Sequence, residues 1–234
     1  MRLIASAIVG LALLTGLATP ARADGSIGFM PGAGDALVHV KTLSDERFTN
    51  VVRQRVDYSC GAAAVATILR YAYFIQTDED GVVRGMLQVS DAKSVRERGF
   101  SLLDIKNYVQ NLGMSGAGYQ ISLEKLYALN VPSIVLLTVD GYEHFVVLKK
   151  ATPQYTYVAD PALGNRAIPT SEFSAAWTGN IIFVIRAPLY DPRNPLESER
   201  GSSTNALADN ILSPSDMLSN SLLMTILIPG PSRL

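Results

Sequence analysis

The sequence predicts an α+β fold, with N-terminal helices packed on a C-terminal antiparallel sheet. Helix-type apolar patterns dominate residues 60–129, and strand-type patterns dominate residues 133–187. Short turns separate the strand-type runs, as in an antiparallel meander. The chain has 234 residues, of which 48% are hydrophobic and 18% charged. This is enough apolar material for the core of a single domain, and it excludes a disordered chain.

The first 23 residues have the features of a secretory signal peptide. Arg2 gives a positive start, residues 3–17 are uncharged and mostly apolar, and residues 21–23 (Ala-Arg-Ala) form a small-x-small cleavage sequence. An uncleaved anchor is the weaker alternative, because the apolar run is shorter than the ~20 residues that a membrane span needs. We therefore expect an exported protein, periplasmic or secreted, with no stable membrane span after cleavage.

The helical part begins after an N-terminal extension at residues 24–50. Alternating apolar and polar residues at 36–41 predict a short strand in this extension. The Ala-, Val- and Leu-rich run 61–74, directly after Cys60, predicts a buried helix that ends before a polar turn at 77–81.

Two further helices have recognisable starting residues. Ser101 is a capping residue with Asp104 three positions later, and the apolar pattern that follows stops at Gly113. A third, shorter helix starts at Ser122 and covers residues 123–129.

The strands come next, and together with the helices they define a domain at residues 51–187. The β-branched and apolar runs lie at residues 133–139, 144–150 and 154–160. A short helix at 171–177 and a last strand at 181–187 complete the pattern.

Residues 188–234 are rich in Pro, Ser, Asn and Asp, which predicts a flexible C-terminal tail. The exception is the apolar stretch 217–228, which could form a short helix. Such a helix could dock on its own domain, on a partner or on a lipid surface, and we favour its own domain.

Composition narrows the function classes. The chain has one Cys, two His and a net charge of −1, so neither nucleic acid nor an anionic membrane is an expected partner. One thiol cannot form an internal disulfide, a Cys-rich zinc site or an iron–sulfur cluster, and we expect no structural metal site.

The single thiol, Cys60, directly precedes the first buried helix. Unpaired backbone N–H groups and the positive end of the helix dipole stabilise a thiolate at such a position. The following Gly61 allows substrate or backbone to approach closely. The alternative is a buried Cys that packs as a small hydrophobic side chain.

A nucleophilic thiol needs a base and an orienting acid. His144 opens an apolar strand after a turn and is a plausible base. Asp160 ends the strand expected to pair with it, and can hold the far nitrogen of the imidazole. Asp140 and Glu143 are nearer alternatives, but Asp140 is typical of a turn and Glu143 is expected on the opposite face.

Gln54 lies six positions before Cys60 and could donate its amide N–H to an oxyanion, next to the backbone N–H of the nucleophile. A solvated surface glutamine is the alternative. The spacing from Gln54 to Cys60 decides between them only through a family pattern.

These residues carry a family resemblance over about residues 51–185. The motif Q-x5-C-G-x-A at 54–63, the strand G-Y-x-H-F-V-V at 141–147 and D-P-A-L-G at 160–164 resemble the double-glycine leader peptidases. These are papain-like cysteine peptidases, best known as the N-terminal domain of bacteriocin export transporters. The resemblance implies a papain-like fold that cleaves leader peptides after Gly-Gly or Gly-Ala.

Carried over to this chain, the resemblance implies that Cys60 is the nucleophile, His144 the base, Asp160 the orienting acid and Gln54 the oxyanion donor. No cofactor is needed. The chain lacks a Walker-type glycine loop and membrane helices, so it is more similar to the stand-alone exported proteins associated with functional-amyloid export.

The sequence therefore predicts a cysteine endopeptidase that cleaves a leader or exported peptide in a bacterial secretion or functional-amyloid export pathway. Its partners would be a peptide or protein substrate, with a Gly-Gly-type site, and the export machinery. One alternative is an export accessory that binds a peptide in the same cleft without cutting it. Another is acyl transfer instead of hydrolysis.

Overall fold

The computed structural model describes residues 42–196 and 212–225. The expected signal peptide at 1–23 and the expected strand at 36–41 lie outside these ranges. The helices and strands described below all belong to one compact unit, Leu43–Leu234.

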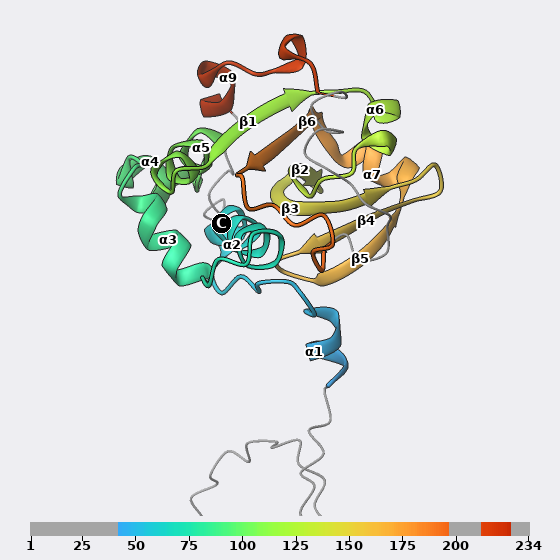
Figure 1. The fold of residues 1–234 in the computed structure, drawn as a ribbon, viewed down its shortest axis with the longest axis horizontal. Helices are drawn as coiled ribbons and strands as arrows, with labels where there is room; N and C mark the ends of the chain where they lie inside the picture. Colours follow the sequence, from blue (N-terminus) through green and yellow to red (C-terminus); the bar gives the residue numbers. More distant parts are fainter. Residues whose placement is uncertain (1–41, 197–211, 226–234) are drawn as a thin grey trace, which may run out of the picture. The chain divides into compact units, whose positions relative to one another are not determined.

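In the described part of the chain, six strands form one antiparallel sheet with the order β1-β6-β2-β3-β4-β5 (Figure 1). The strands are β1 (Ser115–Gln120), β2 (Ser133–Val139), β3 (Tyr142–Ala151), β4 (Tyr155–Asp160), β5 (Gly164–Pro169) and β6 (Trp177–Arg186). The meander expected from the sequence is the central β2-β3-β4 part of this sheet.

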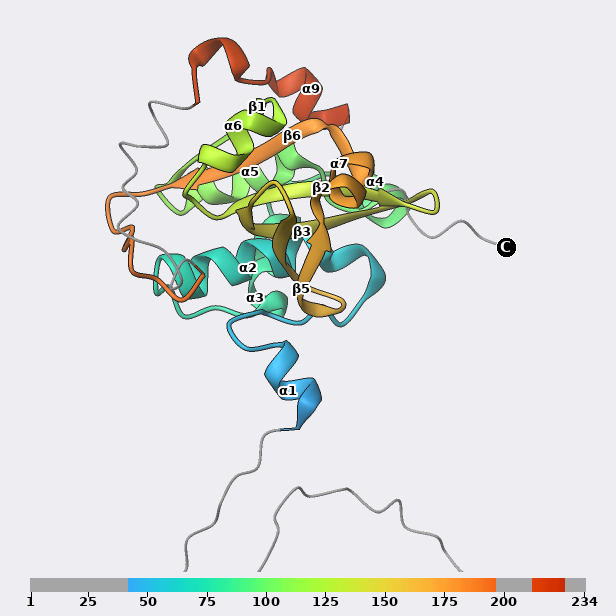
Figure 2. The same cartoon turned by 90° about the vertical axis from the view of Figure 1, so that its right-hand side faces the viewer.

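Helices cover both faces of the sheet, as the edge-on view in Figure 2 shows. The longest helix, α2, lies with α3 and α5 on one face, and the short α6 and α7 lie on the other. The helices are α1 (Leu43–Arg47), α2 (Cys60–Ala72), α3 (Glu79–Leu87), α4 (Ala92–Arg98), α5 (Leu102–Asn111), α6 (Leu123–Ala128), α7 (Thr170–Ala176) and α9 (Asn220–Thr225), with 3₁₀ turns η1 (Asp57–Ser59) and η2 (Pro214–Asp216). The predicted α+β class is confirmed.

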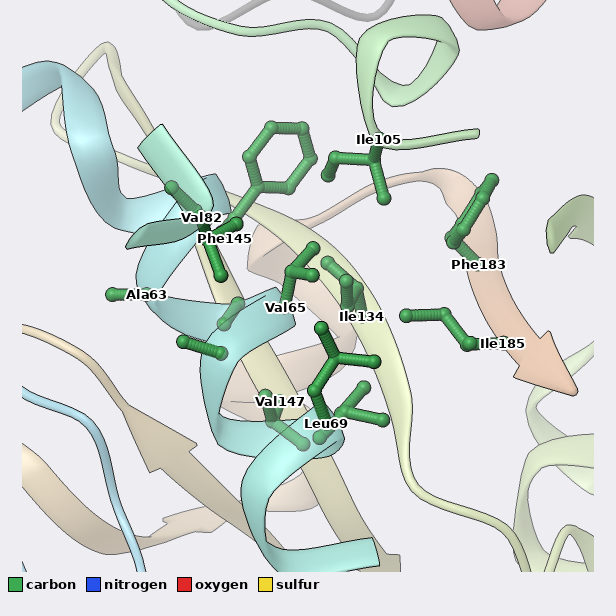
Figure 3. Packing of buried hydrophobic residues seen from close by; sticks show 14 of the residues in the cluster. Ala63, Val65, Leu69, Val82, Ile105, Ile134, Phe145, Val147, Phe183 and Ile185 are labelled. Carbon is green, nitrogen blue, oxygen red and sulfur yellow. The ribbon is translucent and has the colours of Figure 1, made fainter. Parts of the chain in front are cut away.

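Side chains of strand β2 alternate between the two faces of the sheet. Ile134 and Leu136 pack against the α2 side, whereas Val135 and Leu137 pack against the α6 and α7 side. Side chains of a strand alternate between its faces, so a run without polar residues fills two cores at once. The core on the α2 side is drawn in Figure 3, with labelled side chains that include Val65, Leu69, Phe145, Val147, Phe183 and Ile185.

Local sequence signals account for where several helices begin. The Ser101 hydroxyl accepts the Asp104 N–H at the start of α5, and the Asp104 carboxylate accepts the Ser101 N–H, a complete capping box. The Ser122 hydroxyl likewise accepts the Lys125 N–H at the start of α6. Both starts lie where the sequence predicts them.

One predicted turn is wrong. Residues 77–81 do not form a loop between helices, because α3 already begins at Glu79. The Asp78 carboxylate accepts the Gly81 N–H at 2.8 Å and caps this helix, which buries Val82 and Met86. The acidic and Gly content that is typical of a turn is here a helix start.

Strands β1 and β5 are not evident in the sequence either. In β1 the glycines are required by packing, since a Cβ on Gly116 would lie 2.7 Å from the Phe183 ring. Strand β5 follows a turn in which Gly164 has φ +85° and faces the Arg47 carbonyl, where no side chain fits.

The C-terminal segment 212–225 lies beside β1 and α5. The Leu218 N–H donates to the Gly118 carbonyl at 2.7 Å, and Leu223 of α9 is fully buried against Gly118. Within the described residues this segment docks on the domain itself. None of the described helices has the length and apolar character needed to cross a membrane.

Candidate active site

The thiol of Cys60 lies at the first residue of α2 and has no exposed surface. The Phe145 N–H of β3 donates to Cys60 Sγ at 3.4 Å. Gly61 makes this contact possible, because a Cβ at that position would lie only 3.1 Å from the Phe145 ring. The close approach of α2 to β3 thus brings the helix start next to the residue that follows His144.

His144 and Asp160 form a hydrogen-bonded pair at the edge of the same region. Nε2 of His144 lies 2.8 Å from Asp160 Oδ1, and both side chains are largely buried. Nδ1 is also buried and makes no hydrogen bond within the described chain. The imidazole therefore has one nitrogen held by the acid and the other left for the thiol.

The charge state of this pair follows from its surroundings. Burial alone would lower the pKa of His144, but its hydrogen bond to Asp160 and the neighbouring Cys60 thiol raise it to about 9. Burial would also raise the pKa of Asp160, but the His144 hydrogen bond and charge, with two backbone donors, lower it. The structure thus favours an imidazolium beside a carboxylate, and the proton of the imidazolium is one that a thiol can supply.

Asp160 is held on both of its oxygens. Oδ1 also accepts the N–H groups of Ala162 and Leu163 at 2.9 and 3.1 Å. Oδ2 accepts from the Arg166 guanidinium at 3.2 Å. Arg166 is absent from the sequence-based prediction, since a single arginine on an unrecognised strand gives no signal. These four donors fix the carboxylate in the orientation that His144 needs.

The two nearer acids do not replace Asp160. Asp140 is in the β2-β3 turn with φ +52°, as a turn residue. Glu143 lies on β3 next to His144, and burial raises its pKa. Neither forms a hydrogen bond with His144 in the part of the chain that the structure describes.

Gln54 lies in the segment that leads into Cys60. Its backbone N–H donates to the Pro161 carbonyl at 2.9 Å, directly after Asp160. Its side-chain Oε1 is buried without a hydrogen-bond partner among the described residues. The amide oxygen is therefore not bound into a structural network, and the backbone of Gln54 lies beside the turn that follows Asp160.

Tyr142 links strand β3, which carries His144, to the η1 turn before Cys60. Its ring stacks on His144 with centroids 6.2 Å apart, and its hydroxyl donates to the Asp57 carbonyl at 3.1 Å. Burial, together with the charges of Cys60 and Asp57, raises the pKa of Tyr142. The partly exposed Tyr142 ring thus contacts both His144 and the η1 turn.

A second acid near the thiol was missed by sequence reasoning. Glu79 of α3 is 4% exposed and contacts the residue before Cys60. Its signal in the sequence was the Asp78 cap followed by the apolar spacing of Val82 and Met86, which marks α3. In residues 42–196 and 212–225, no three His, Cys, Asp or Glu side chains cluster as a metal site.

Comparison with known proteins gives one matching family and several relatives. A model of the "Peptidase C39 family" matches residues 49–188. A Pseudomonas aeruginosa protein named "Probable functional amyloid protease FapD" is 44% identical over 191 residues, 81% of this chain and 83% of its own. A Pseudomonas fluorescens protein of the same name is 42% identical over 187 residues, 80% of this chain and 82% of its own.

Among solved structures, this chain is similar to a double-glycine-motif protease from an AMS/PCAT transporter in complex with its leader peptide. The identity is 30%, the TM-score is 0.46, and the match covers 58% of this chain and 89% of the other.

Proposed function

The chain belongs to the peptidase C39 family, and on that basis we propose that it is a cysteine endopeptidase with Cys60, His144, Asp160 and Gln54 as its catalytic groups. The observation that carries the proposal is the His144–Asp160 hydrogen bond of 2.8 Å, which leaves Nδ1 of the same ring for Cys60. A thiol, a base and an orienting acid in this order are what nucleophilic acyl transfer requires.

In the proposed reaction, the proton of Cys60 has already passed to His144 as the base, and the resulting thiolate attacks the peptide carbonyl. The carbonyl oxygen becomes an oxyanion held by the Gln54 amide and the Cys60 N–H, which as the first residue of α2 has no acceptor within the helix. The imidazolium then gives its proton to the leaving amine, and water hydrolyses the acyl-enzyme. Asp160 stays ionised throughout and holds the ring.

The pathway is part of the proposal. Two relatives above 40% identity are named as probable functional amyloid proteases, which supports a substrate among the peptides or proteins of a functional-amyloid or related secretion system. The expected signal peptide would place the enzyme in the periplasm or outside the cell, where it would meet such exported chains. Gly-Gly or Gly-Ala is the cleavage site to test first, as the family's reaction.

The direct test is to incubate the purified protein with peptides that contain Gly-Gly or Gly-Ala, and with the secreted proteins encoded beside it, and to map new termini by mass spectrometry. We expect cleavage by the wild type and a loss of at least about 10³-fold in Cys60→Ala. Equal cleavage by Cys60→Ala and wild type would refute the proposal.

A non-cleaving peptide-binding role is the second candidate, and the full burial of Cys60 favours it. A thiol without exposed surface has to become accessible before it can attack, whereas binding needs no such opening. Alkylation separates the two, since a thiolate paired with imidazolium reacts with iodoacetamide at pH 6 and an inert core thiol does not. We expect alkylation at Cys60, abolished in Cys60→Ala. Retention of peptide binding without alkylation would favour the accessory role.

A further inference from the structure

A buried carboxylate contacts the segment between Gln54 and Cys60, two of the proposed catalytic residues, yet it touches none of the reacting atoms. Glu79 is the first residue of α3 and only 4% exposed. A carboxylate is costly to bury unless hydrogen bonds compensate for its lost hydration. Its partners therefore show what the burial achieves.

Both hydrogen-bonding partners of Glu79 belong to the Gln54–Ser59 segment. The Arg55 N–H donates to Glu79 Oε1 at 2.7 Å, and the Ser59 hydroxyl contacts the same oxygen. The Arg55 guanidinium is 3.9 Å from Oε2, with its side chain largely in solvent. One oxygen thus joins the residue after Gln54 to the residue before Cys60.

The backbone at Gln54 is fixed from two sides. Its own N–H donates to the Pro161 carbonyl, and the next N–H, of Arg55, donates to Glu79. Two consecutive amides held by different elements restrict both backbone dihedrals of Gln54, and these set the direction in which its side chain leaves the chain.

At the other end of the segment, Ser59 fixes the position of the Cys60 N–H, the second proposed donor. Ser59 is fully buried, its hydroxyl also lies 2.7 Å from the Val56 carbonyl, and its peptide supplies the N–H of Cys60. Ser59 does not cap α2 with its side chain. Its hydroxyl instead anchors the start of the helix to Glu79.

We propose that Glu79 is a positioning residue that sets the spacing between the Gln54 amide and the Cys60 N–H, the two donors of the oxyanion hole. This inference rests on the proposed function. Oxyanion stabilisation depends on donors fixed in advance about 3 Å from where the charge develops, so loosening the segment between them lowers the rate of acylation. Substrate contacts elsewhere, and the thiolate itself, are not involved.

Glu79→Ala and Glu79→Gln test the geometry. Glu79→Ala removes the acceptor of both contacts and should lower kcat for a Gly-Gly peptide about 10- to 100-fold with little change in KM, less than the ~10²–10³ for loss of a donor itself. Glu79→Gln keeps an oxygen that accepts both hydrogen bonds, and should stay within about 3-fold of wild type. Asp80→Ala is the matched control, because this neighbouring carboxylate is exposed and forms a salt bridge with Arg84 on the same helix.

Two readouts separate positioning from a general loss of structure. Alkylation of Cys60 by iodoacetamide forms no oxyanion, so its rate should be unchanged in Glu79→Ala. In a double-mutant cycle, adding Glu79→Ala to Gln54→Ala should lower kcat little further, because the effect of Glu79 acts through the Gln54 donor. If circular dichroism shows Glu79→Ala unfolded, Ser59→Ala, which removes one of the two contacts, takes its place in the cycle.

The outcomes distinguish the inference from the function beneath it. If Cys60→Ala or Gln54→Ala cleaves the peptide as fast as wild type, the proposed function fails and the inference fails with it. Three other results would overturn only the Glu79 inference, provided that Gln54→Ala lowers kcat. One is an unchanged kcat in Glu79→Ala, and another is a fold-loss that is the same with and without Gln54→Ala. The third result is an equal fold-loss in the rate of Cys60 alkylation.

Discussion

The two faces of the sheet both carry a buried core, but helices pack on them in different ways. On one face α2 contributes small side chains, and Ala62, Ala63 and Ala66 have no exposed surface. On the other, α7 and the start of β6 contribute the rings of Phe173 and Trp177, with centroids 5.7 Å apart. Small residues let a helix approach a strand closely, whereas aromatic rings hold the elements apart.

The functional consequence lies at the N-terminus of α2. Because Gly61 and the alanines bring this helix against β3, the Phe145 N–H reaches Cys60 Sγ and the thiol lies beside the strand that carries His144. We infer that one face determines the site and the other mainly stability, a division that substitutions can test.

The largest expected effect is on the site side. Asp160→Asn removes the charge that holds the His144 imidazolium while keeping the size of the side chain, and should lower kcat/KM about 10²- to 10⁴-fold. Peptide cleavage kinetics measure the loss, and circular dichroism checks the fold. Asp140→Asn and Glu143→Gln are matched controls, since neither acid bonds His144 in the described structure, and both should stay near wild type. A comparable loss in either control would contradict the assignment of Asp160.

The next largest effect is on the opposite face. Phe173 is fully buried against Trp177, so Phe173→Ala should lower the free energy of unfolding by about 3–5 kcal/mol through lost burial and the cavity left behind. The folded fraction should keep its kcat/KM. Chemical denaturation measures the loss, and Leu189→Ala, at a side chain 82% exposed, is the control with almost no expected change. A kinetic defect in folded Phe173→Ala would break the division between the faces.

The fold could be predicted from the sequence wherever apolar spacing or a capping residue marks an element. The β2-β3-β4 meander and the starts of α5 and α6 have clear apolar spacing or capping residues. Strand β1 lacks these signals because Gly116 is required by the space beside Phe183 and Gly118 by the space beside Leu223, which are tertiary constraints. Helix α3 was mistaken for a turn because Asp78 and Gly81 are common to both.

The candidate site divides in the same manner. Cys60, His144 and Asp160 could be proposed because rare residue types and a family motif mark them. Arg166 and Glu79 could not, since both belong to common residue types, and both lie on elements that the sequence did not reveal. Each is identified only by a contact that folding creates: Arg166 binds the Asp160 carboxylate, and Glu79 binds the Ser59 hydroxyl.

The third prediction concerns pH. The pKa of His144 is about 9 in the folded protein, above the 6.5 of an ordinary imidazole, so the folded state binds this proton more tightly than the unfolded chain. The resulting stabilisation is fully present below about pH 6.5 and is lost as pH rises through about 9. On the alkaline side of the pH profile, kcat/KM should also fall near pH 9, since the imidazolium protonates the leaving amine.

Thermal melts between pH 6 and 10, with the pH profile of kcat/KM, check the sign. In Asp160→Asn the loss of stability at high pH and the alkaline limb of kcat/KM should both move to lower pH, because the negative charge that helps to raise the pKa of His144 is gone. An alkaline limb that stays near pH 9 in this variant would show that Asp160 does not set the titration of His144.

The smallest expected effect tests the close approach of α2 itself. In Gly61→Ala the new Cβ would lie 3.1 Å from the Phe145 ring, which must move by a few tenths of an ångström. Overpacking at a tight contact costs about 1 kcal/mol at the low end of its range, so a modest loss of stability is expected. Because Phe145 follows His144 and also donates to Cys60, a several-fold loss of kcat/KM should accompany it.

Ala63→Gly provides the matched comparison two residues further along α2, where the change shortens a buried side chain without adding an atom beside Phe145. Its cost should be in stability alone, about 1 kcal/mol from the helix propensity of glycine. Alkylation of Cys60 in both variants identifies the step affected, because a displaced thiol changes its rate whereas a loosened helix does not. If Gly61→Ala loses stability but keeps both kcat/KM and the alkylation rate, the spacing of α2 from β3 has more tolerance than the site requires.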